Sequence, residues 1–236
     1  MFSLLILLMV ALAGMAGFWA LLQWQKTRSM LLLFNLLVLL TVMLHGLSAG
    51  IGHWVGVGQE LRGYYILPLL LGIVALPFSL FGFAGISRAS GFAWARIDWG
   101  HGIVDILAVA LLLWTLPRIL SMQALVPGCW QDVIWYAYAV PPSLACEGHV
   151  PDPGLVAPLP LVPIAVVLCY LGLGAGLWWR QRWPWLLAGM AVGAVLLVLP
   201  AGWGPVPQFA GELVCAVYMV VVAVRHARNQ PPRPGP

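Results

Sequence analysis

Charged side chains are scarce in this sequence. Of 236 residues, 11 are lysine or arginine and 7 are aspartate or glutamate, so only 8% are charged while 62% are hydrophobic. An average soluble domain has about 25% charged and about 45–50% apolar residues. So few polar groups cannot cover an apolar surface of this size in water, and the composition therefore predicts a protein whose solvent is lipid.

Basic stripes and metal-binding motifs are also missing. The arginines stand in short segments between apolar runs, not on one face, which excludes nucleic-acid binding. The sequence contains no HExxH, no CxxC and no two histidines four residues apart, so no metal site is predicted. His45 and His53 are about 12 Å apart along a helix and cannot share an ion. Because His45 has no histidine partner at its depth, we expect no haem.

Long hydrophobic runs dominate what is present. Seven are close to the roughly 20 residues that a helix needs to cross a bilayer. No charge precedes the first run, so we expect a retained span, not a cleaved signal peptide. The sequence predicts an all-α integral membrane protein with a single seven-helix domain over residues 1–228. The expected spans are about 2–22, 30–51, 64–86, 100–120, 155–178, 183–201 and 207–225.

The basic residues are distributed unevenly between the two sides of this arrangement. With the N-terminus outside and the C-terminus cytoplasmic, only Arg62 and Arg118 face outward. The cytoplasmic segments hold Lys26, Arg28, Arg88, Arg96, Arg180, Arg182, Arg225, Arg228 and Arg233. Positive charge is enriched in cytoplasmic loops. The distribution therefore predicts a multi-pass protein of the bacterial inner membrane in this orientation.

One connection is unusually long. Residues 121–154 are expected to form an outer loop, and loops of this length are usually functional. Cys129 and Cys146 lie on the oxidising side, which favours a disulfide bond between them. Asp132–Tyr138 is expected to be a short amphipathic helix on the membrane surface. The proline-rich residues 229–236 are predicted to be a disordered cytoplasmic tail.

Polar residues within the spans are the candidate site, because ionisable groups are costly in lipid unless they face a protein interior or a watery cavity. Depths estimated from the helical rise of about 1.5 Å per residue separate two layers. The inner third holds Asn35, His101 and Asp105, and the outer third holds His45, Ser48 and Glu212.

Each carboxylate has two candidate partners. Asp105 is expected to pair with His101 one turn away or to accept a hydrogen bond from Asn35. Glu212 is expected to pair with His45 or with Arg118. Such groups act either as a binding site or proton relay, or only as hydrogen bonds that hold helices together.

The helix count and orientation resemble those of microbial rhodopsins and of the alkaline ceramidase class of membrane hydrolases. Those pigments need a lysine in the seventh helix, whereas the only lysine here is Lys26, so a retinal Schiff base is excluded. The ceramidase class holds zinc with an HxxxH pair in its last helix. This last helix offers only Glu212 and His226, the latter expected in solvent at the cytoplasmic edge. We therefore predict no cofactor.

Three functions are consistent with these features. The first is a polar intramembrane site that binds or transports a small solute or protons. The second is an intramembrane enzyme acting on a lipid or isoprenoid, with Asp105 or Glu212 as general acid or base. The third is an accessory or anchor subunit of a membrane complex. All have membrane lipids as neighbours, but only the third requires a partner membrane subunit.

Overall fold

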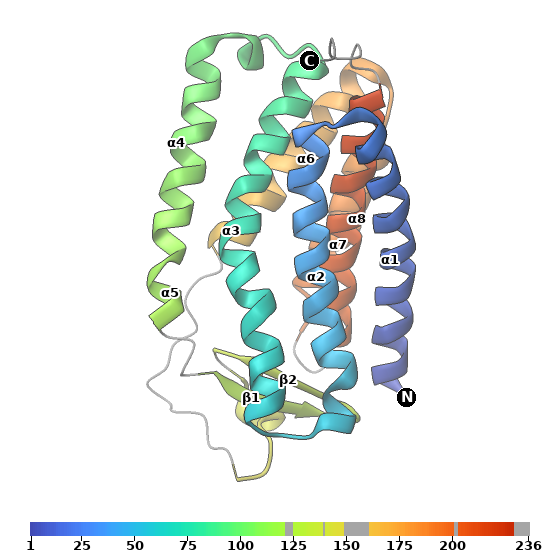
Figure 1. Cartoon of the computed structure of the whole chain (residues 1–236), viewed down its shortest axis with the longest axis vertical. Helices are drawn as coiled ribbons and strands as arrows, with labels where there is room; N and C mark the ends of the chain where they lie inside the picture. The colour runs from blue at the N-terminus through green and yellow to red at the C-terminus, as the bar shows by residue number, and fades with distance from the viewer. Residues whose placement is uncertain (121–124, 139, 149–160, 201–202, 229–236) are drawn as a thin grey trace.

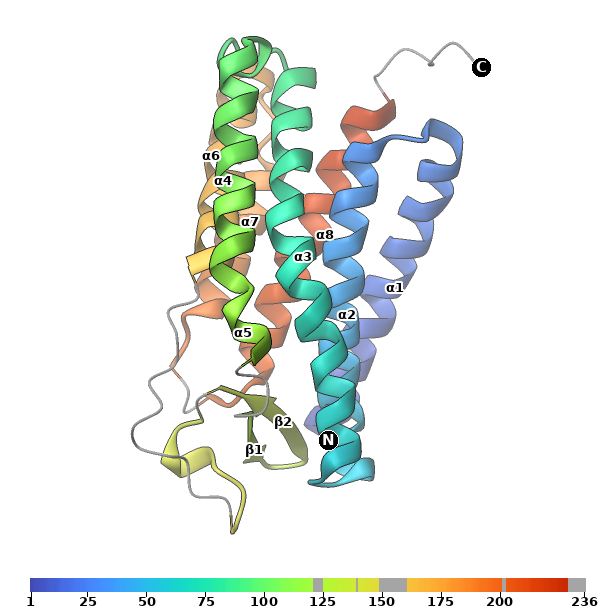
Figure 2. The same ribbon diagram turned by 60° about the vertical axis from the view of Figure 1, so that its left-hand side comes forward.

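The computed structural model describes residues 1–120, 125–138, 140–148, 161–200 and 203–228, without the side chains of Asp98, His101, Arg118 and Leu120. Within these ranges, the long helices form a bundle in which consecutive long helices run in opposite directions (Figures 1 and 2). They are α1 (Phe2–Thr27), α2 (Met30–Val55), α3 (Gln59–Ala89), α4 (Asp98–Thr115), α6 (Leu161–Gln181), α7 (Trp185–Leu197) and α8 (Val206–Arg228). The shorter elements are the 3-10 helices η1 (Trp94–Arg96) and η3 (Pro142–Leu144), α5 (Pro117–Leu120), and strands β1 (Val126–Trp130) and β2 (Val133–Ala137).

Five of the described helices, α1, α2, α3, α6 and α8, are long and apolar enough to cross a membrane. The apolar stretches of α4 and α7, Gly102–Thr115 and Trp185–Leu197, are shorter. Prolines limit both helices, because Pro117 follows the end of α4 and Pro184 precedes the start of α7. The chain is therefore a helical protein with several helices suited to a bilayer, as its composition predicts.

Helix ends differ from the expected spans in a regular way. α2 continues to Val55 and α3 extends from Gln59 to Ala89, several residues beyond the apolar runs. Hydropathy marks the part of a helix that lies in hydrocarbon, whereas backbone hydrogen bonding continues into the headgroup layer. The expected tail (229–236) and the start of the fifth span (155–160) lie outside the described residues.

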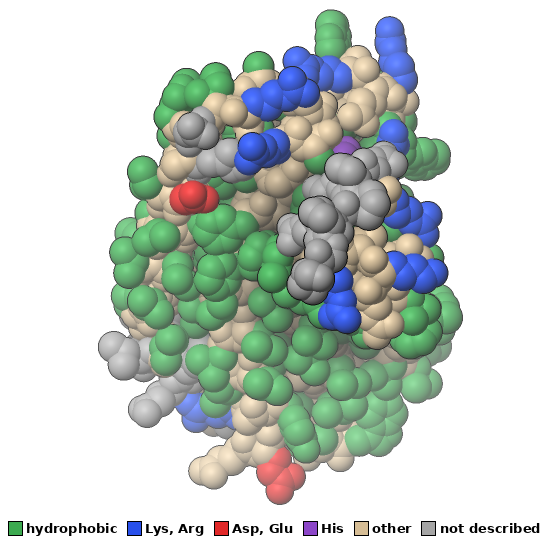
Figure 3. All heavy atoms as spheres, turned by 45° about the horizontal axis from the view of Figure 1, so that its top comes forward, with side chains coloured by type: hydrophobic (Ala, Val, Ile, Leu, Met, Phe, Trp, Pro, Cys, Tyr) green, Lys and Arg blue, Asp and Glu red, His purple; other side chains and the backbone are tan. Residues whose placement is uncertain are grey.

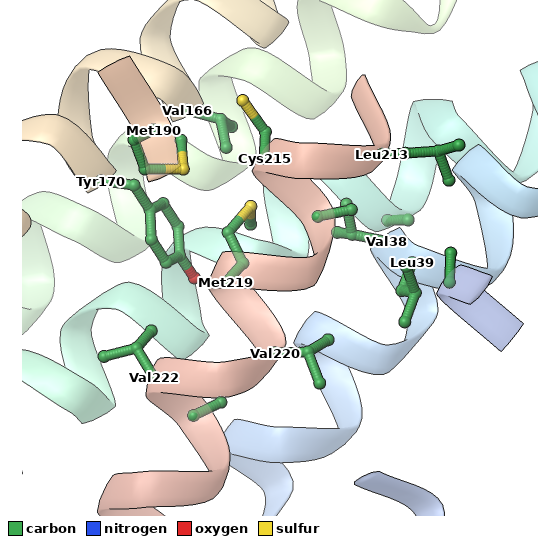
Figure 4. Close-up of a cluster of buried hydrophobic side chains, with 14 of the residues drawn as sticks. Val38, Leu39, Val166, Tyr170, Met190, Leu213, Cys215, Met219, Val220 and Val222 are labelled. Atoms are coloured by element: carbon green, nitrogen blue, oxygen red, sulfur yellow. The ribbon is translucent and has the colours of Figure 1, made fainter. Parts of the chain in front are cut away.

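The helices α2 and α8 form the centre of the bundle. α2 packs against α1, α3 and α8, and α8 also packs against α1 and α7. Figure 4 shows Val38 and Leu39 of α2 close to Val220 of α8, while Tyr170 of α6 lies beside Met219. By contrast, α4 packs against α3 and stands at the edge of the bundle (Figure 1).

Small residues make two of these helix contacts close. A Cβ atom at Gly50 would lie 2.6 Å from Leu7 of α1, and one at Gly193 would lie 2.3 Å from the Cys215 sulfur of α8. Glycines at these positions let the helix backbones approach, which is how dispersion contacts accumulate in lipid. Gly46/Gly50 and Gly189/Gly193, each with four-residue spacing, therefore lie at helix interfaces.

The long connection contains a hairpin, so the expected surface helix over Asp132–Tyr138 is wrong. β1 and β2 pair antiparallel, with Cys129 opposite Ile134 and Trp130 opposite Val133. The segment Val133–Tyr136 is β-branched and aromatic, which suits an extended strand with cross-strand contacts. The Cys129–Cys146 disulfide is present, with a Cα–Cα distance of 4.9 Å, and joins β1 to the segment after η3.

The hairpin is attached to the end of the bundle where α1 begins. Asp132, in the turn between the strands, accepts hydrogen bonds from the backbone amides of Phe2 (3.0 Å) and Ser3 (3.1 Å), and pairs with the amino group of Met1. It therefore caps the N-terminus of α1, where unpaired N–H groups favour a negative charge. Burial opposes ionisation of this carboxyl, but these hydrogen bonds outweigh burial and hold the Asp132 pKa well below its ordinary value.

The opposite end of the bundle is basic. Lysine and arginine side chains gather on the face shown in Figure 3. Several of their guanidinium groups lie over aromatic rings, with carbon-to-centroid distances of 4.5–5.3 Å: Arg28 over Trp24, Arg180 over Phe92, Arg225 over Trp183 and Arg228 over Trp19. Aromatic and basic side chains together are typical of a membrane–water interface.

Candidate functional site

The structure brings His45 of α2 and Glu212 of α8 into direct contact. Their Nδ1 and Oε2 atoms are 3.0 Å apart, and each side chain is 24% exposed. Both residues lie in the half of the bundle next to the hairpin, as their similar depths in the sequence predict. Of the two partners considered for Glu212, His45 is the one that the structure places beside it, whereas the Arg118 side chain lies outside the described residues.

Aromatic rings surround the imidazole of His45. The Phe209 ring of α8 and the Tyr65 ring of α3 both meet it edge-on, with centroid distances of 4.9 and 5.6 Å. Besides His45, the titratable residues Tyr65 and Cys215 lie close enough to Glu212 to interact with its charge. The pair therefore lies in an aromatic setting with few other polar groups, where an ionic hydrogen bond is strengthened by the low dielectric.

Tyr65 links this pair to the hairpin. Its hydroxyl donates to the Ile134 carbonyl of β2 (3.4 Å), and its ring lies 5.8 Å from that of Tyr136. The Tyr136 hydroxyl in turn donates to the carbonyl of Gly58 (3.0 Å) and accepts from its amide (3.2 Å), in the α2–α3 connection. The hairpin therefore covers the end of the bundle one layer of side chains above His45.

Ser48 occupies the same half of the bundle but has no free hydroxyl. Its Oγ–H group faces the carbonyls of Leu44 (2.9 Å) and Tyr64 (3.1 Å). The second contact ties α2 to α3 at the level of the site. Ser48 therefore positions the helices that carry His45 and Tyr65.

Asn35 belongs to a different cluster from the one expected. Its amide nitrogen donates to the Leu31 carbonyl (2.8 Å), and its oxygen accepts from the Tyr170 hydroxyl of α6 (2.7 Å). That hydroxyl also lies 3.0 Å from the Ser79 carbonyl of α3. Asn35, Ser79 and Tyr170 are completely buried. The cluster is a completely buried hydrogen-bonded junction of three helices, and a binding or relay role for Asn35 stays a prediction.

The sequence reasoning missed Tyr170. A tyrosine in the middle of an apolar run was the available signal, because a buried phenol hydroxyl needs a hydrogen-bond partner. The missing information was which helix lies opposite, and this depends on the order of helices around the bundle.

Asp105 is not joined to Asn35. It lies on α4, on an exposed face whose next residue, Ile106, is 71% exposed. The expected hydrogen bond between Asn35 and Asp105 is therefore wrong. Asn35 lies on the central helix α2, whereas α4 packs against α3 at the edge of the bundle. The His101 side chain lies outside the described residues, so its pairing with Asp105 stays a prediction.

His226 is buried at the basic end, not solvated as expected. The residue is 4% exposed, with Nε2 2.9 Å from the Ser90 hydroxyl and Nδ1 2.9 Å from the Val222 carbonyl. It therefore ties α8 to the end of α3. Sequence position alone suggested solvent because arginines flank it.

Among the described residues, no three His, Cys, Asp or Glu side chains come together as ligands for a metal ion. Comparisons with protein-family models, with curated proteins and with solved structures find no match to this chain.

Proposed function

We propose that this chain is a multi-pass membrane protein that binds a proton, or a small polar solute whose binding depends on protonation, at His45 and Glu212. The observation that carries the proposal is the 3.0 Å contact between these two side chains, both partly exposed and held between α2 and α8. Histidine ordinarily changes charge between pH 5 and 8, so a histidine–carboxylate pair between helices is a natural proton-dependent contact.

The connection to the hairpin supports a response to binding. Protonation of Glu212 or loss of the His45 contact would alter the packing of Tyr65, which hydrogen-bonds β2. The disulfide keeps the hairpin and the segment after it together, so they would respond as one unit. The hairpin is thus suited to act as the cover of the site.

Binding from one side is favoured over transport through the bundle. Towards the basic end, the next described polar cluster between the central helices is the Asn35–Tyr170 junction, which is completely buried and internally hydrogen-bonded. A proton or solute path across the bundle would have to break this junction. We therefore place the function at the outer site.

We also propose that the chain has the membrane orientation predicted from the charges of its loops. All seven long helices would cross the bacterial inner membrane, with the hairpin outside and the basic end in the cytoplasm. The short helices α4 and α7 would span by local thinning of the bilayer or by extension through flanking residues. The arginine–aromatic contacts at the basic end support this direction.

The test uses the full chain in lipid vesicles, with the hairpin side facing the external solution. Infrared difference spectra recorded after an external pH jump from 8 to 5 should show a shifted carboxylate stretching band, which both Glu212→Gln and His45→Gln should remove. A matched Asp105→Asn variant should keep the band. An unchanged spectrum in Glu212→Gln would refute the site. Proton flux into the vesicle lumen would show that the function is proton translocation and not binding alone.

A second function, that of an accessory subunit, is supported by Asp105. Its carboxylate lies on an exposed face of α4 with Ile106, Val109 and Leu113, all more than half exposed. A carboxylate facing lipid is costly, and a polar group on a partner helix would satisfy it. Asp105→Asn should then release a co-purifying membrane protein in mild detergent, whereas His45→Gln should not. Purification of the wild type without a partner would exclude this role.

A further inference from the structure

A cavity separate from the His45 site lies between α3 and α6 near the basic end. Its volume is about 230 Å³, and its wall includes Phe83 and Ser87 of α3 and Leu168 of α6. The α3–α4 connection adds Phe92 and Trp94. Leu168 is 61% exposed, so the cavity is open on the side where α6 faces lipid. Pockets for whole drug-sized molecules measure about 300–1,000 Å³, so this one suits a segment of a longer apolar chain.

The cavity wall contains a buried hydroxyl group, that of Ser87. The Ser87 hydroxyl is completely buried and has no hydrogen-bond partner among the described residues. Ser79 and Ser90 on either side of it each donate to a helix carbonyl, so Ser87 departs from its own neighbours. A buried hydroxyl without a partner is costly, and a ligand that offers an oxygen acceptor would satisfy it.

Two arginines lie beside the cavity wall. Arg180 donates to the Gly91 carbonyl (2.9 Å), and its guanidinium carbon is 4.9 Å from the centre of the Phe92 ring. A Cβ atom at Gly91 would lie 3.2 Å from Nη2 of Arg96, so both guanidinium groups reach the same turn. Neither forms an ion pair with a carboxylate that the structure describes. Arg180 uses one of its five N–H donors for the Gly91 carbonyl, which leaves others for an anion.

We propose that this cavity binds an anionic diacyl glycerophospholipid from the cytoplasmic leaflet. One acyl chain lies in the cavity and continues along Leu168, an ester carbonyl accepts from Ser87, and the phosphate binds Arg96 and Arg180. Basic pockets between membrane helices on the cytoplasmic side are suited to anionic headgroups. The inference uses the proposed orientation but not the His45–Glu212 function, and each can fail without the other.

Gly172 of α6 provides a clean test, because it lines the cavity and an added Cβ atom there meets nothing within 4 Å. Gly172→Leu should fill the cavity without disturbing the helix packing. Gly63→Leu is the matched control, since Gly63 is equally open but lies near the hairpin end of α3. The purified full chain is titrated with dioleoyl phosphatidylglycerol, and bound lipid is counted by native mass spectrometry.

We expect one retained phosphatidylglycerol in the wild type and in Gly63→Leu, and none in Gly172→Leu. The Arg96→Gln/Arg180→Gln variant should bind about 25-fold more weakly, from about a factor of five for each guanidinium. Dioleoyl phosphatidylcholine should be retained less than phosphatidylglycerol, and glycerol phosphate should not compete. Equal retention of both lipids, retention in Gly172→Leu, or competition by glycerol phosphate would overturn the proposal.

Ser87→Ala separates lipid recognition from a structural role. Without lipid, removing an unpaired buried hydroxyl should leave the melting temperature unchanged or raise it. With phosphatidylglycerol, the same variant should gain less stabilisation than the wild type. A decrease in melting temperature that is the same with and without lipid would show that Ser87 stabilises the fold. It would contradict the role of Ser87 as a hydrogen-bond donor to the ligand.

Discussion

The His45–Glu212 contact can be measured with a double-mutant cycle. The variants are His45→Gln, Glu212→Gln and the double substitution, which replace the titratable groups while keeping a similar side-chain volume. Since α2 and α8 are joined at this level by the pair itself and by packing, the cycle isolates the interaction between the two side chains.

The expected coupling energy is about 1–2 kcal/mol. Exposed ion pairs contribute about 0–1 kcal/mol, and hydrogen bonds between membrane helices average about 0.6 with a maximum near 1.7. Hydrogen bonds to charged groups reach about 1.5–3 kcal/mol. With side chains 24% exposed and a 3.0 Å contact, this pair lies between the solvent-exposed and the fully buried case.

Unfolding in mixed detergent, followed by tryptophan fluorescence, gives the four free energies, and the chain has 13 tryptophans to report on it. The matched control combines Glu212→Gln with Thr115→Val. In the part of the chain that the structure describes, Thr115 hydrogen-bonds within its own helix α4, which packs against α3. The control cycle should be additive within about 0.5 kcal/mol. A coupling below this value for His45 and Glu212 would refute the claim that their contact is an energetic link between α2 and α8.

Three further predictions concern the hairpin and the buried junction. Gly52→Ala should destabilise the fold by more than about 1 kcal/mol in thermal melts, because its Cβ would lie 2.5 Å from the Ile134 carbonyl oxygen, whereas Gly63→Ala, in open space, should be neutral or stabilising. Tyr170→Phe should cost about 1–2 kcal/mol of unfolding free energy, since it leaves two buried acceptors without their donor; an unchanged value would contradict the junction. Asp132→Ala should cost about 1 kcal/mol as a lost helix cap. Because folding lowers the Asp132 pKa, the wild-type advantage should be fully present above about pH 5 and be lost progressively as the pH falls from about 4 towards the lowered folded-state pKa; an advantage that grows on acidification would be opposite in sign to the linkage.

The depth of His45 and Glu212 was predictable because both lie on long apolar helices with a constant rise per residue. Their agreement in depth needs only the start of each helix and its direction. The same arithmetic placed Asn35 and Asp105 at one level, yet they do not meet. Depth is a coordinate along the membrane normal, and it does not state which helices are neighbours in the plane of the membrane.

The hairpin is a second feature that the local sequence pattern could not predict. The stretch Asp132–Tyr138 has polar and aromatic residues that fit one face of a short helix as well as alternate faces of a strand. Cross-strand pairing with β1, the contact of Ile134 with Gly52 and the Tyr136–Gly58 hydrogen bonds select the strand. These contacts come from segments distant in the chain, so the sequence of the stretch cannot contain them.

The sequence by itself determined that the chain forms apolar helices suited to a bilayer, where its apolar runs begin and end, which end of the bundle is basic, and that Cys129 and Cys146 could pair. These properties follow from transfer free energies and helical rise, which each segment carries alone. Only the tertiary structure decided that α2 meets α8 and that α4 stays at the edge. As a result, His45 contacts Glu212, Asn35 accepts a hydrogen bond from Tyr170, and Asp105 stays exposed. The sequence could not predict these contacts, because helix order depends on side-chain packing between segments far apart in the chain.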